Sequence, residues 1–80
     1  MTKFSKDELD LHKIYDKLFE TMVEMILTYK DTQKVASTMM SQALRLYKSI
    51  LTDGEFKEMI RTIAEKSKNI QSFEEDKTIH

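Results

Sequence analysis

Residues 51–56 read Leu-Thr-Asp-Gly-Glu-Phe, and this stretch marks the place where one helix ends and the next begins. Thr52 and Glu55 have the spacing of a capping box, in which each side chain bonds a backbone N–H group that the first helical turn leaves unpaired. Leu51 and Phe56 stand where a hydrophobic staple places its two apolar side chains. The stretch therefore predicts a helix that begins directly after Thr52.

The same signal stands near the beginning of the sequence. Ser5 and Glu8 have the spacing of a capping box, and Phe4 and Leu9 have the spacing of a hydrophobic staple. These four residues predict a helix that begins at about residue 6.

A third helix start is predicted between these two. Asp31 and Thr32 are both good N-cap residues, although no Gly or Pro accompanies them. An unbroken helix from residue 6 to residue 51 could not fold its apolar face onto itself. The sequence therefore predicts one all-α domain over residues 1–70, with three helices at about 6–29, 32–51 and 53–70. Residues 71–80 are mostly polar and are expected to form a flexible tail.

Composition excludes several classes of protein. The 80 residues contain no Cys, no Pro and one Gly, and the formal net charge is −1. Disulfides and thiolate metal sites are therefore excluded, and a strongly electrostatic partner for the whole molecule is not expected. No apolar run is long enough to span a membrane, and the first residues lack the apolar region of a signal peptide. We therefore expect a cytoplasmic protein.

The first two predicted helices carry unusually wide apolar faces. Apolar side chains cover about half of each circumference, whereas a helix in a three-helix monomer needs a stripe somewhat over 100° wide. Val23 and Leu27 lie at the edge of the polar face, where a monomer would leave them in water. The surplus predicts a homodimeric helical bundle. The predicted interface residues are Phe19, Val23, Ile26, Leu27, Met40, Leu44 and Tyr47.

Charge is unevenly distributed along the chain. Residues 32–52 contain three basic side chains and no acidic one, and these three fall within about 60° of one another on the helical wheel. Small hydroxyl side chains lie among them. This face could contact phosphate groups of a nucleic acid. The candidate phosphate-contacting residues are Lys34, Ser41, Arg45 and Lys48.

Candidate chemistry is sparse. Glu8, His12 and Asp16 lie on one helical ridge, but no second helix offers matched ligands, so the row is interpreted as an exposed charge ladder rather than a metal site. No nucleophile elbow, phosphate-binding loop or metal-binding helix motif is present. We therefore expect neither catalysis nor a cofactor.

The middle third of the chain resembles a known group of proteins. Residues 35–40 (Val-Ala-Ser-Thr-Met-Met) and 43–48 (Ala-Leu-Arg-Leu-Tyr-Lys), followed by Leu51-Thr52, Glu55-Phe56 and Met59, resemble small all-helical proteins of unknown function from marine phages and marine metagenomes. The resemblance implies a cytosolic accessory protein, and it implies no activity.

Together these features favour a small interaction module that acts by homo-oligomerisation and partner binding, in scaffolding or regulation. The alternative is a nucleic-acid-binding regulator that uses the basic face of the second helix.

Overall fold

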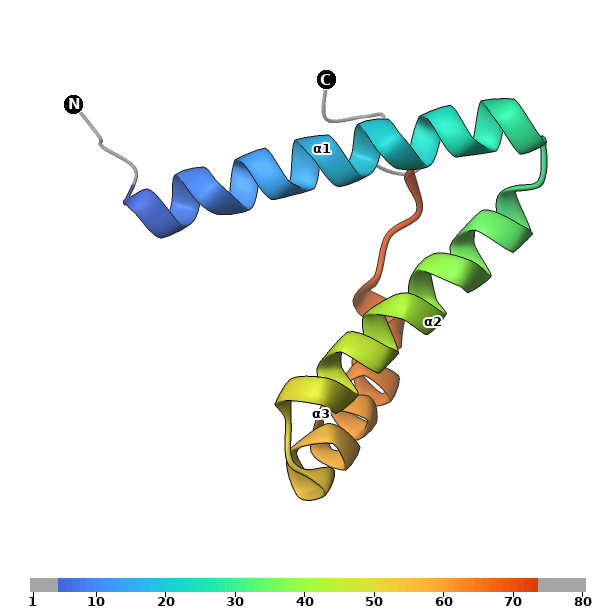
Figure 1. Cartoon of the computed structure of the whole chain (residues 1–80). Helices are drawn as coiled ribbons and strands as arrows, with labels where there is room; N and C mark the ends of the chain where they lie inside the picture. The colour runs from blue at the N-terminus through green and yellow to red at the C-terminus, as the bar shows by residue number, and fades with distance from the viewer. Residues whose placement is uncertain (1–4, 74–80) are drawn as a thin grey trace. The chain divides into compact units, whose positions relative to one another are not determined.

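The computed structural model describes residues 5–73. Within this range the chain forms α1 (Lys6–Tyr29), α2 (Thr32–Ile50), α3 (Asp53–Glu65) and the short 3₁₀ helix η1 (Ser67–Asn69), and it contains no strand (Figure 1). The predicted all-α fold with three helices is thus confirmed for this part of the chain. Phe4 of the predicted staple, residues 74–80 of the predicted tail and the terminal His80 lie outside the described residues.

Both predicted capping boxes are present. At the start of α1, the backbone N–H of Glu8 donates to the Ser5 hydroxyl at 3.1 Å, and the backbone N–H of Ser5 donates to the Glu8 carboxylate at 3.2 Å. At the start of α3, Thr52 and Glu55 exchange the same two bonds at 3.2 and 2.9 Å. Local side-chain chemistry therefore fixes where these two helices begin.

The link between α1 and α2 consists of Lys30 and Asp31. Lys30 adopts the left-handed conformation, with φ 56° and ψ 37°, and its N–H donates to the carbonyl of Ile26 at 2.8 Å. The Asp31 carboxylate then accepts a bond from the backbone N–H of Lys34 at 3.0 Å. Asp31 is therefore the N-cap of α2. It is one of the two residues, Asp31 and Thr32, that the sequence offered for this role.

The third helix is shorter than the prediction of 53–70. It ends at Glu65, and η1 follows with i to i+3 bonds from Asn69 to Lys66 and from Ile70 to Ser67. Residues 66–69 read Lys-Ser-Lys-Asn, and Ser and Asn side chains favour non-helical turns by competing for backbone bonds. Because this run has no apolar face to bury, the chain leaves the α-helix there.

The chain divides into two compact units, Met1–Gln42 and Ala43–His80, and the boundary falls within α2. The single domain predicted over residues 1–70 stays a prediction. Among residues 5–73, Val35 is the one buried hydrophobic side chain. In the first unit the half-buried apolar side chains are Met22, Val23, Met25, Ile26 and Met39, and in the second they are Leu44, Leu51, Phe56 and Met59.

We expect Thr52→Ala to lower the free energy of unfolding by about 1 kcal/mol, because it removes the hydroxyl that caps α3. Urea denaturation at one fixed protein concentration, followed by circular dichroism, measures the change. Thr32→Ala is the matched control, since Thr32 is an exposed residue in the first turn of α2, and its effect should stay below about 0.5 kcal/mol. Equal losses in the two variants would contradict the capping role of Thr52.

We expect Lys30→Gly to raise the free energy of unfolding by about 0.5–1 kcal/mol. Lys30 adopts left-handed backbone angles, which are strained for a residue with a side chain but not for glycine. Lys66→Gly is the matched control. Lys66 has φ −100°, so glycine there relieves no strain and only adds freedom to the unfolded chain, which should lower stability. Denaturation midpoints that fall in both variants would rule out strain at Lys30.

Candidate functional site

A single stripe of apolar residues runs along most of α1. Its members alternate at spacings of four and three residues, which is the heptad pattern of a coiled-coil seam. We call this stripe the α1 seam, and its members are Leu11, Tyr15, Leu18, Met22, Met25 and Tyr29. The sequence predicted a wide apolar face on this helix but not the seam within it, and the four-three spacing is the signal in the sequence that reveals the seam.

The two halves of the α1 seam differ in exposure. In the N-terminal half, Leu11 is 66% exposed and Leu18 is 58% exposed. The rings of Tyr15 and Phe19 stack one helical turn apart, with centroids 6.1 Å apart and planes 7° from parallel. In the C-terminal half, Met22 and Met25 are half-buried, whereas Tyr29 at the end of the helix is 72% exposed. The N-terminal half therefore presents an ordered apolar surface to solvent.

A groove lies in the first unit, where α1 gives way to α2. We call it the corner groove, and it encloses about 440 Å³. Met25 and Tyr29 of α1 line it together with Val35 and Met39 of α2. Polar groups complete the lining, and they are contributed by Asp31, Lys34, Thr38 and Gln42. The apolar part of this lining continues the C-terminal half of the α1 seam, through Met25 and Tyr29, onto α2.

The predicted interface residues are divided between the two units. In the first unit Phe19, Leu27 and Met40 are exposed, whereas Val23 and Ile26 are half-buried. In the second unit Tyr47 is exposed and Leu44 is half-buried. Val23 is thus less exposed than its place at the edge of the polar face suggested, while Leu27 is 69% exposed, as expected.

The predicted phosphate-contacting residues of the first unit are Lys34 and Ser41, and both are exposed. The Lys34 ammonium lies 3.6 Å from the carboxylate of Asp31, the N-cap of the same helix. Its charge is therefore partly balanced by a neighbouring acid within the same structural unit.

In the second unit, Lys48 is engaged at the start of α3. Its ammonium lies 3.3 Å from the Asp53 carboxylate and 5.1 Å from the centroid of the Phe56 ring, where a cation–π interaction is favourable. Arg45, by contrast, has no carboxylate within ion-pair distance in the described part of the chain. Two of the three predicted cations thus already face an acid.

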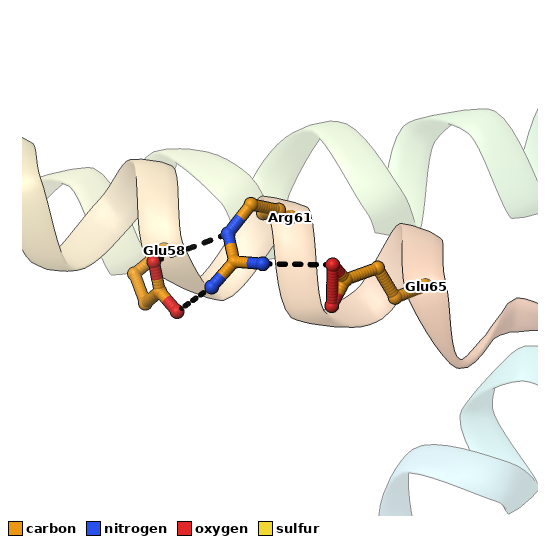
Figure 2. A network of polar contacts seen from close by, with 3 residues as sticks. All are labelled: Glu58, Arg61 and Glu65. Atoms are coloured by element: carbon orange, nitrogen blue, oxygen red, sulfur yellow. Dashed lines mark hydrogen bonds and ion pairs between the residues drawn. The ribbon is translucent and has the colours of Figure 1, made fainter.

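The carboxylates stabilise helices rather than converge on a site. Figure 2 shows the Arg61 guanidinium between Glu58 and Glu65, one turn away on either side in α3. Arg61 donates to both carboxylate oxygens of Glu58, and to Glu65 at 2.7 Å. Glu8, which begins the row with His12 and Asp16, serves the capping box of α1. Across residues 5–73, no group of His, Asp and Glu side chains is placed to hold a metal ion.

None of the helices described between residues 5 and 73 is both long and apolar enough to cross a lipid bilayer. Comparison of the chain with protein-family models, with curated proteins and with solved structures finds no match. The resemblance to small phage proteins therefore stays a prediction.

We expect no mobility shift of duplex DNA or structured RNA at physiological salt, because two of the three cations on the candidate face, Lys34 and Lys48, already lie beside carboxylates and Arg45 alone is left there to displace counterions. A gel-shift titration over a range of salt concentrations measures this. A salt-sensitive shift that Arg45→Glu abolishes, with the oligomeric mass unchanged, would contradict this expectation and favour the nucleic-acid alternative.

Proposed function

We propose that this chain is a helical protein-interaction module that assembles with a second copy of itself through the apolar surface of its first unit. It would act by binding, as a scaffold or regulator, and not by turnover. The observation that carries the proposal is the exposed N-terminal half of the α1 seam, where Leu11, Tyr15 and Leu18 have more than half of their surface in solvent.

Helix energetics support the proposal. An isolated helix is only marginally stable in water, and most helical stability in proteins comes from packing of the apolar face. α1 has 24 residues and is therefore about 36 Å long. The part of α2 that shares its unit, residues 32–42, is only about 16 Å long, so it can cover less than half of α1. Within the first unit, α2 therefore leaves the remainder of α1 uncovered.

The chemistry of the exposed surface also favours binding. Large exposed apolar patches on small proteins mark interaction sites more often than chance exposure of single side chains does. Aromatic side chains, which are enriched at the centres of protein interfaces, supply part of this surface through Tyr15 and Phe19. Many acidic groups of the described chain serve caps and short-range ion pairs, among them Glu8, Asp31 and Glu55 at helix starts, so they supply no argument for a reaction.

Nucleic-acid binding through Lys34, Ser41, Arg45 and Lys48 remains the second candidate. The exposed Arg45 favours it, because this guanidinium has no acidic neighbour within residues 5–73 and could contact a phosphate. The acids beside Lys34 and Lys48 weigh against it. We rank it below self-association for that reason.

Size-exclusion chromatography with light scattering tests the proposed function on the full chain. We expect at least twice the 9.5 kDa mass of one chain at micromolar concentration. A mass of one chain, together with a compact monomer whose α1 side chains are protected from solvent, would show that the chain covers this surface itself and would end the proposal.

Two single-residue variants locate the interface. We expect Phe19→Glu to raise the dissociation constant of the dimer about 100-fold or more, because each dimer would lose two buried aromatic rings and bury two charges. Leu27 is also one of the predicted interface residues, and the sequence predicts that a charge there disrupts the dimer. Because Leu27 lies at the edge of the apolar face, where rim residues contribute less, we propose that Leu27→Glu raises the constant by about tenfold or less. Sedimentation equilibrium measures both constants. Equal effects would mean that added charge alone, rather than position, weakens assembly.

A further inference from the structure

The α1 seam is symmetric about its middle. Leu18 and Met22 lie two residues to either side of Glu20, Tyr15 and Met25 lie five residues away, and Leu11 and Tyr29 lie nine residues away. Two α1 helices laid antiparallel about this midpoint therefore place every seam residue opposite another seam residue.

The two halves of the seam are also complementary in shape. The N-terminal half projects Leu11, Tyr15 and Leu18 from a helix that has no other element of its unit beside it. The C-terminal half opens into the corner groove. An antiparallel pair brings the projecting half of each copy to the groove of the other. A parallel pair would place the two projecting halves together and leave both grooves unfilled.

We propose that two copies pair through antiparallel α1 helices, and that Leu11 and Tyr15 of each copy fill the corner groove of the other. This inference rests on the proposed function and specifies its partner, interface and orientation. Leu18 of each copy then packs against Met22 of the second copy near the two-fold axis, with Leu11 against Tyr29 and Tyr15 against Met25 at either end.

The area is adequate for a stable dimer. The antiparallel overlap from Leu11 to Tyr29 is about 27 Å long. The six seam residues are flanked by Ile14, Phe19 and Ile26, and each aromatic side chain alone buries about 150–250 Å² when fully covered. These nine side chains supply on the order of the 800 Å² per partner that a standard interface buries.

The flanks of the seam raise no electrostatic barrier. On one flank, Thr21 of each copy meets its counterpart beside the axis, and Ile14 approaches Thr28 of the second copy. On the other flank, Phe19 meets its counterpart. No like charges oppose each other at these positions, so shape rather than charge sets the orientation.

Single cysteines test the orientation, because the natural chain has none. In the antiparallel pair, the two copies of residue 21 are about 3 Å apart along the helix axis, whereas the two copies of residue 28 are about 24 Å apart. We therefore expect a short bismaleimide to link Thr21→Cys into covalent dimers about 100-fold faster than Thr28→Cys. The reason is that linking within a dimer proceeds at a millimolar effective concentration, while linking between dimers depends on micromolar protein.

A mixed sample provides the positive control for residue 28. Ile14→Cys and Thr28→Cys should each remain largely unlinked alone, but a re-equilibrated mixture of the two should give covalent heterodimers. Equal rates for Thr21→Cys and Thr28→Cys, or no linking in samples that light scattering shows to be dimeric, would overturn the antiparallel pairing while leaving self-association intact. A single-chain mass for these variants and for the natural chain would instead mean that the proposed function has failed.

Discussion

Coverage of the apolar face of α1 is the constraint on which the rest of this molecule depends. A helix of 24 residues gains little net stability from its own backbone bonds, so its order depends on what packs against its apolar side. Only the start of α2 shares its unit, and Val35 is the one buried hydrophobic side chain among residues 5–73. Self-association follows as a proposal from this constraint, because a second α1 has the length and the apolar pattern to cover the first.

Local capping chemistry holds the helix ends in place independently of that packing. Ser5 with Glu8, and Thr52 with Glu55, each satisfy two backbone N–H groups through one reciprocal pair of bonds. Asp31 caps α2 directly after Lys30 has turned the chain. Each of these contacts joins residues that lie close together in the sequence. They therefore define the helix boundaries without a hydrophobic core. The caps set where each helix begins, while the stability of the helices still depends on what covers their apolar faces.

The ion pairs, like the caps, act between residues that lie close together in the sequence. Lys48 joins the end of α2 to the start of α3 through Asp53 and the Phe56 ring, and Arg61 bridges two glutamates within α3. Exposed pairs of this kind contribute little each, about 0.2–1 kcal/mol. These pairs stabilise helix ends and helix faces, and they do not bring charged groups together at a binding site. The exposed apolar surface is therefore the feature of the first unit that is best suited to bind a partner.

Sequence alone determined the fold class, the starts of all three helices and the width of the apolar faces, because caps and periodicity act over a few neighbouring residues. It placed the end of the third helix too late, since residues 66–69 lack apolar positions and the stop there is set by weak helix propensity rather than by a breaker. Tertiary structure decided that Val23 is half-buried, that Lys48 faces Asp53 and Phe56, and that Met25, Tyr29, Val35 and Met39 line one groove. These features depend on the path of the chain through Lys30 and Asp31 and through Leu51 and Thr52, and a helical period measured along one helix carries no information about the turn that joins it to the next.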